Sequence, residues 1–198
     1  GLLARPNAGK STLISRCSGA KPKIAAYPFT TVEPILGAVS THGKDFVMME
    51  VPGLLEGAHK GVGLGHEFLR HAERARIYVH VIDGLADDPV ADLKMLNNEL
   101  RMFSQALSDK SQIIAVNKID VTEVREKMGE IEFFLREALV EEEVVSNTPG
   151  AEPAAEVPIM FISAVTGEGV TDMLGKLVEY LSVETEEAKE AQETEPIP

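Results

Sequence analysis

Residues 4–12 read ARPNAGKST, and this short stretch decides the fold. It matches the end of the phosphate-binding pattern G-x-x-x-x-G-K-[S/T], with Gly9, Lys10 and Ser11 in place and Ala4 where the pattern opens with glycine. A glycine lets the backbone approach phosphate oxygens closely, and the lysine reaches the β- and γ-phosphates. Because such a loop leads into a helix whose first N–H groups face the anion, the sequence predicts a phosphate site here.

A second tetrapeptide narrows the ligand to a guanine nucleotide. Asn117, Lys118, Ile119 and Asp120 follow the apolar run 113–116, which is typical of a buried parallel strand. Ligands bind at the carboxyl ends of such strands. The Asp120 carboxylate can accept hydrogen bonds from the ring N–H and the exocyclic amine of guanine, a donor pair that adenine lacks. A plain strand-end turn would also use Asn and Asp, but the upstream phosphate loop favours guanine recognition.

Length and composition exclude several classes of protein. With 198 residues, 44% of them hydrophobic, the chain suits one α/β domain, and no apolar run reaches the ~18 residues of a membrane span. The single cysteine, Cys17, fits a packing role and a reducing compartment, which favours the cytoplasm. We also expect a monomer with no membrane partner. Of the formal charge of −13, the Glu-rich segments 141–157 and 184–198 contribute −5 each. The remainder gives no basic surface for nucleic acid.

Strands and helices alternate along the sequence, which predicts an α/β fold of the P-loop NTPase type. We expect a mostly parallel, doubly wound sheet with one antiparallel hairpin strand. Strands are expected at 1–3, 35–41, 45–51, 77–82, 112–116 and 159–162, and helices at 10–17, 66–75, 90–107, 122–140 and 170–182. Residues 1–182 would form the nucleotide-binding domain, with a first strand that is cut short, and the acidic residues 183–198 a disordered tail or linker.

Two further segments are candidates for sensing the γ-phosphate. The first contains Phe29, Thr30, Thr31, Val32 and Glu33, between the first helix and the second strand. One of its threonines is expected to meet Mg²⁺ when the γ-phosphate is present. Without the phosphate loop, the same threonine pair would be taken for ordinary surface residues.

The second segment is Glu50, Val51, Pro52 and Gly53, at the end of an expected strand. The glycine N–H can bind the γ-phosphate, and the acid can hold a magnesium-bound water. Most GTPases place Asp where this chain has Glu50, whose side chain is one methylene longer. The following residue, Leu54, cannot orient an attacking water, so slow hydrolysis is expected.

The loop Ser163, Ala164 and Val165 follows the last expected strand and could present backbone N–H groups to guanine O6. A dinucleotide-binding interpretation of the glycine-rich run 61–65 is disfavoured, because the G-x-G-x-x-G spacing is missing. The histidines show no spacing that suggests zinc.

These residues together resemble the GTPase domain of the bacterial Obg family. The stretches that carry the resemblance are 5–12, 20–31, 52–58, 63–71 and 80–83. It implies Ser11 and Thr31 as magnesium ligands, and Lys10, Thr31 and Gly53 as the catalytic set. It also implies that the nucleotide lies among residues 4–12, 29–33, 50–53, 117–120 and 163–165. Assembly of the large ribosomal subunit is the implied role, and since the family's glycine-rich N-terminal domain is not among these residues, we expect a fragment.

The sequence therefore predicts a switch protein that binds GTP and GDP and hydrolyses GTP slowly with Mg²⁺. Two alternatives remain. Ala4 and Glu50 depart from the family pattern, so the chain could be a nucleotide-binding module that no longer hydrolyses. An Obg-like ATPase is the other alternative, against which Asp120 argues. Asn7 occupies the position at which some GTPases recruit K⁺, although it could equally hydrogen-bond the loop backbone.

Overall fold

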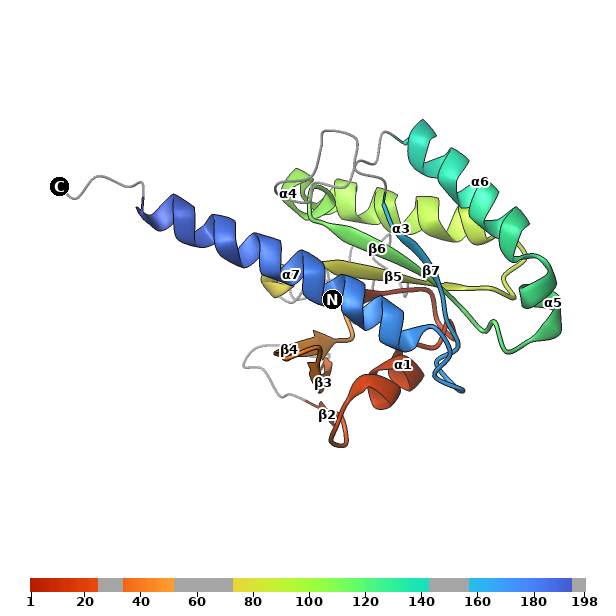
Figure 1. The fold of residues 1–198 in the computed structure, drawn as a ribbon. Helices are drawn as coiled ribbons and strands as arrows, with labels where there is room; N and C mark the ends of the chain where they lie inside the picture. Colours follow the sequence, from red (N-terminus) through yellow and green to blue (C-terminus); the bar gives the residue numbers. More distant parts are fainter. Residues whose placement is uncertain (25–33, 52–72, 143–156, 194–198) are drawn as a thin grey trace.

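The computed structural model describes residues 1–24, 34–51, 73–142 and 157–193 (Figure 1). The elements in chain order are β1 (Leu2–Leu3), α1 (Lys10–Cys17), β2 (Lys23–Ile24), β3 (Ile35–Thr41), β4 (Lys44–Met49), β5 (Tyr78–Asp83), α3 (Pro89–Phe103), α4 (Gln105–Ser108), β6 (Gln112–Asn117), α5 (Thr122–Glu126), α6 (Met128–Glu141), β7 (Ile159–Phe161) and α7 (Val170–Glu193).

Two groups of strands form the sheet. Four parallel strands lie in the order β1-β5-β6-β7, and three antiparallel strands lie in the order β2-β3-β4. A parallel bridge between Leu2 and Glu50, and a 3.1 Å hydrogen bond from the Val51 N–H to the Leu2 carbonyl, connect β4 to β1. Across the described strands only β3 therefore runs against the rest, which confirms the expected mostly parallel sheet with one antiparallel hairpin strand.

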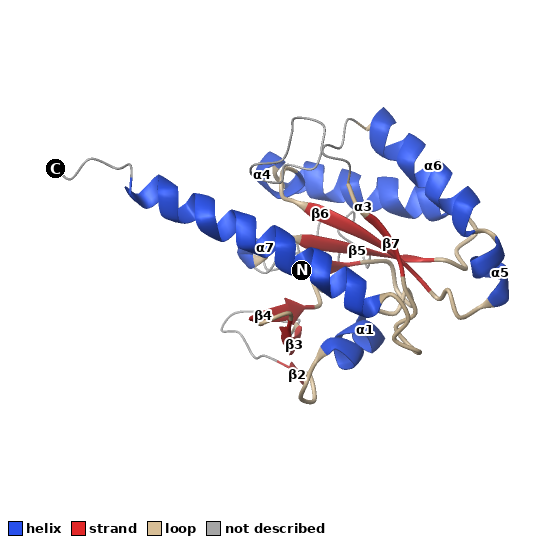
Figure 2. Cartoon of the chain, in the orientation of Figure 1, coloured by secondary structure: helices blue, strands red, loops and turns tan. Residues whose placement is uncertain are grey.

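Helices cover both faces of the sheet, as a doubly wound fold requires (Figure 2). On one face α1 and α7 bury Leu13, Ile14, Met173 and Leu177. On the other face α3 and α6 bury Leu93, Leu96, Ile131 and Leu135. Each such side chain contributes ~1.5–3 kcal/mol when fully buried. All six residues of β6 are buried because helices lie on both of its faces, and this explains its unbroken apolar run.

Three helix boundaries differ from expectation. The helix expected at 90–107 is interrupted at Ser104, whose extended backbone (φ −166°, ψ 134°) separates α3 from α4. The helix expected at 122–140 is divided into α5 and α6 at Lys127. The last helix continues to Glu193 instead of ending near residue 182. The division into a domain and an acidic tail stays a prediction, and residues 66–72 of another expected helix lie outside the described residues.

The topology determines where a ligand can bind. The chain leaves β1 through the phosphate loop, and β1 lies between β4 and β5, where the strand order reverses. The carboxyl end of a strand at such a reversal of strand order is where open α/β sheets bind ligands. The loops after β6 and β7 open at the same edge, so both predicted recognition segments meet the phosphate loop there.

Candidate nucleotide-binding site

The phosphate loop is a tight turn between β1 and α1. The Ala8 N–H donates to the Arg5 carbonyl (3.4 Å), and the Lys10 ammonium lies 3.1 Å from the Ala4 carbonyl. Gly9 has φ +100°, and a Cβ at this position would lie 2.3 Å from Asn117 Nδ2. Only glycine fits such a backbone and such a contact. Ala4 is buried and is not among the positive-φ residues, so its Cβ causes no strain where the pattern has glycine.

The exposed rim of the loop consists of Arg5, Pro6, Asn7, Ser11 and Thr12. Asn7 has φ +67°, a conformation that asparagine tolerates better than most residues. The structure does not decide between a potassium ligand and a backbone contact for Asn7. The potassium role stays a prediction, which exchanging potassium for sodium at constant ionic strength would test.

A carboxylate stands beside the loop lysine. Glu50 Oε1 lies 3.8 Å from Lys10 Nζ, and both side chains are largely buried. Glu50 Oε2 is buried and has no hydrogen-bond partner among the described residues. A buried carboxylate oxygen of this kind is costly unless something donates to it. A water bound to Mg²⁺ is such a donor, so the longer glutamate side chain fits the role expected for it.

Asn117 joins the phosphate loop to the loop after β7. Its side-chain N–H₂ donates to the Ala8 carbonyl (2.8 Å), and its Oδ1 accepts from the Ala164 N–H (2.9 Å). Both hydrogen bonds are buried. A buried amide that satisfies both partners fixes the distance between the two loops, and removing it would leave both partners unsatisfied.

Asp120 is oriented by a neighbouring hydroxyl. Ser163 Oγ donates to Asp120 Oδ1 (2.6 Å), while the Ser163 oxygen accepts from the Thr166 N–H (3.0 Å). Asp120 remains exposed at the strand ends, so its carboxylate can still meet a ligand. The preceding residue, Ile119, is buried and donates its N–H to the Ile162 carbonyl (3.2 Å). This geometry suits a carboxylate that reads two N–H donors on one edge of a base.

Two ion pairs near the site are not expected from the sequence. Lys118 Nζ pairs with Asp83 Oδ2 at 2.5 Å, which ties the carboxyl ends of β5 and β6 together. The Arg5 guanidinium donates to the buried Asp92 (2.6 Å), and this hydrogen bond raises the pKa of Arg5. In a parallel sheet the carboxyl ends of neighbouring strands lie side by side. The position of Asp83 at the end of its strand could therefore have predicted a contact with the segment after β6.

Not every predicted site residue can be placed. Lys10, Ser11, Glu50, Val51, Asn117, Asp120 and Ser163 lie around the same edge of the sheet, together with their sequence neighbours. The remaining candidates lie outside the described residues; they are Phe29, Thr30, Thr31, Val32, Glu33, Pro52 and Gly53. Their roles stay predictions.

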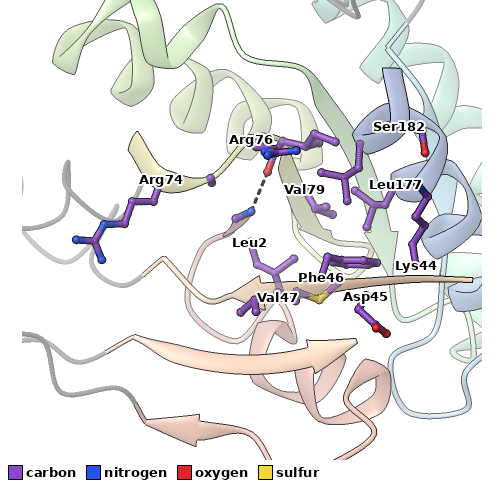
Figure 3. A pocket seen from close by; sticks show the side chains of 15 residues that line it. Leu2, Lys44, Asp45, Phe46, Val47, Arg74, Arg76, Val79, Leu177 and Ser182 are labelled. Carbon is purple, nitrogen blue, oxygen red and sulfur yellow. Dashed lines mark hydrogen bonds between the residues drawn. The ribbon is translucent and has the colours of Figure 1, made fainter. Parts of the chain in front are cut away.

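The rest of the described chain offers little other chemistry. A cavity of about 390 Å³ lies at the opposite, amino-terminal edge of the sheet, between β4, Arg76, Ile77 and α7 (Figure 3).

Burial raises the pKa of the Cys17 thiol to about 11, so it is not a thiolate at neutral pH. The described residues include no group of three or more His, Cys, Asp or Glu arranged to hold a metal. None of the described helices combines the length and apolarity that crossing a membrane requires.

The fold and the two recognition segments define a P-loop GTPase domain, and comparisons with known proteins agree. The model of the 50S ribosome-binding GTPase family matches residues 1–118, and the chain belongs to this family. The resemblance to Obg proteins is confirmed. GTPase Obg of Synechococcus sp. (strain JA-3-3Ab) is 46% identical over 182 residues, which are 91% of this chain and 43% of that protein. GTPase Obg of Anaeromyxobacter sp. (strain Fw109-5) is 48% identical over 178 residues, with coverage of 88% and 46%.

Solved structures support the same fold. The G domain of the T. maritima FeoB iron transporter has a TM-score of 0.62 and 25% identity, covering 91% of this chain and 96% of that one. A nucleolar GTP-binding protein 1 from Plasmodium falciparum has a TM-score of 0.67 at 18% identity, covering 97% and 90%, and it shows the fold alone. The chain spans less than half the length of the curated relatives described above.

Proposed function

We propose that this chain is the GTP-binding and GTP-hydrolysing domain of an Obg-type switch protein. The observation that carries the proposal is the pair of contacts made by Asn117, which brings the phosphate loop and the base-reading loop to a fixed separation. Asp120, oriented by Ser163, supplies the carboxylate that would select guanine. Family membership supports both assignments.

The proposed residues have two roles: some stabilise the negative charge at the phosphates, and others sense the γ-phosphate. Lys10 and the first N–H groups of α1 would stabilise the negative charge on the transferred phosphoryl group. Thr31 and the Gly53 N–H, which lie outside the described residues, are proposed to sense the γ-phosphate. Leu54 offers no hydrogen-bonding group for water, so we propose a low intrinsic rate that a partner or an ion increases.

Magnesium is the metal that the donors would fit. Ser11 and Thr31 would be direct ligands, and Glu50 would accept from a bound water through its unpartnered oxygen. Magnesium held there would supply positive charge against the phosphate oxygens. The chain itself orients the phosphates through the loop and Lys10.

The partner proposed for the switch is the large ribosomal subunit, in the cytoplasm. Its support is the family to which the chain belongs, whose model is described as a 50S ribosome-binding GTPase. The alternative of a module that binds GTP but does not hydrolyse it rested on Ala4 and Glu50. Ala4 no longer supports it, because this residue causes no backbone strain. An Obg-like ATPase is disfavoured by the intact Asn117–Asp120 segment.

Base selection is the sharpest test of this proposal. The Asp120→Asn variant should bind GDP at least tenfold more weakly and xanthosine diphosphate more tightly, because xanthine has an acceptor where guanine has its amine. Titration calorimetry with GDP, ADP and xanthosine diphosphate measures this exchange. The parent protein should prefer GDP to ADP by a large factor, and equal affinity for the two would overturn the assignment.

A further inference from the structure

Arg16 connects the helix that follows the phosphate loop to the loop that faces the base. It lies in the last turn of α1, and its side chain crosses to the segment after β7. Its Nε donates to the Ala164 carbonyl (3.2 Å), and a terminal nitrogen donates to the Val165 carbonyl. One guanidinium therefore holds two successive carbonyls, which a planar group with several donors in a fixed arrangement can do.

The remaining hydrogen bonds of this loop leave one amide for a ligand. The protein acceptors of the other N–H groups between 163 and 168 are the Glu168 carbonyl, Asn117 Oδ1, Ser163 Oγ, the Ser163 carbonyl and Thr166 Oγ1. Within the described part of the chain, the Val165 N–H has no acceptor. It belongs to the same peptide as the Ala164 carbonyl, and in a trans peptide these two groups point in opposite directions. By fixing the carbonyl, Arg16 therefore fixes the direction of this N–H.

We infer that Arg16 is a positioning residue for guanine recognition, which holds the Val165 N–H toward guanine O6. The inference rests on the proposed function, since it presumes that the base lies beside Asp120 and Ser163. Asp120 reads the donor edge of guanine, and the Val165 N–H reads the adjacent carbonyl. Adenine has an amine in place of O6, so the same N–H would also reject adenine.

Through this contact, α1 connects the phosphate loop to the loop after β7. The amino-terminal end of this eight-residue helix faces the phosphate loop, and its carboxyl-terminal end carries Arg16. Gly167 lies against the arginine, since a Cβ there would be 3.7 Å from Arg16 Cδ. Displacing α1 would therefore shift the loop that reads the base.

The experiment compares GDP with 6-thio-GDP, in which a weakly accepting sulfur replaces O6 while the N1–H and the amine are kept. Arg16→Ala should weaken GDP binding about five- to tenfold, the usual scale for one net hydrogen bond. Binding of 6-thio-GDP should change less than twofold, so the preference for oxygen over sulfur should shrink. Arg16→Lys, which reaches one carbonyl at a time, should give an intermediate loss.

The control variant is Arg136→Ala, which removes another arginine whose ion pair with Glu132 lies within one helix. Its nucleotide affinities should match those of the parent, and thermal melting should show that all variants are folded. Equal losses for GDP and 6-thio-GDP, or no loss for either, would overturn the role of Arg16 while leaving the preference for GDP over ADP intact. A parent protein that does not distinguish GDP from ADP would instead overturn the proposed function, and this inference with it.

Discussion

Glu50 illustrates what a single residue contributes to the site. Its Oε1 faces Lys10 at 3.8 Å, and its Oε2 is buried without a described partner. The carboxylate is therefore already desolvated and directed at the phosphate loop before any metal arrives. Such an oxygen has more to gain from a metal-bound water than an exposed carboxylate would have.

Glu50→Gln should raise the Mg²⁺ concentration needed for tight GTP binding about tenfold, because the amide keeps the shape and loses the charge. Titrating GTP affinity against Mg²⁺ measures this change. Glu50→Asp is the matched control: it keeps the charge, should keep the magnesium dependence, and should raise turnover if the extra methylene is a handicap. An unchanged magnesium dependence in the glutamine variant would rule out a role for Glu50 at the metal.

At the scale of elements, the turn between β1 and α1 depends on one backbone conformation. Gly9 precedes α1 with φ +100°, and the amide of Asn117 occupies the space next to it. The loop, the helix and β6 therefore meet at a point that has no room for a methyl group. Asn117 can occupy its bridging position only because residue 9 has no side chain.

Gly9→Ala should abolish tight nucleotide binding and lower the free energy of unfolding by more than ~1 kcal/mol, since it adds strain and a steric clash. Gly129→Ala provides the control, because this glycine lies in the first turn of α6 and an added Cβ meets no atom within 4 Å. That change should leave the stability unchanged or raise it by less than the ~0.5–1 kcal/mol typical of a helix interior. Urea unfolding and GDP titration check both variants, and normal binding by Gly9→Ala would refute this account of the turn.

Across the whole molecule, the inner strand β5 contains an ionisable residue in a fully buried position. His80 is inaccessible to solvent, and neither ring nitrogen has a hydrogen-bond partner among the described residues. Burial lowers the pKa of His80 to about 3. The folded protein therefore keeps this histidine neutral at pH values where the unfolded chain would protonate it.

The sign of the resulting pH dependence follows directly. The stability associated with neutral His80 is complete above pH ~6.5 and falls as the pH drops toward 3, by at most ~1.4 kcal/mol per pH unit. Urea unfolding at pH 7.5, 6.5 and 5.5 should show this fall, and His80→Leu should reduce it. The exposed His42, changed to Asn, should leave the slope as in the parent; an identical slope in the His80→Leu protein would contradict the prediction.

The sequence predicted the fold from two signals that depend on local pattern, namely the phosphate loop and the buried runs of the parallel strands. It also predicted that Asn117, Asp120 and Ser163 would face the ligand. It did not predict Arg16, because its partners lie 148 and 149 positions away and are backbone carbonyls, which have no residue-specific signal. The break at Ser104 was missed because the apolar spacing continues through it, although serine is a common residue at helix starts.

The contacts of Asn117 also bear on how the chain acquires its binding site. Ala8 and Ala164 lie 109 and 47 positions from the asparagine that connects them. Pairings over such separations require long loops to close, so we expect them to form in the later steps of folding. During synthesis, a nascent chain that has emerged only as far as α3 would contain the complete phosphate-loop sequence without the residues that hold it in place. Nucleotide capture would then begin only after the last strand and its loop have joined the sheet.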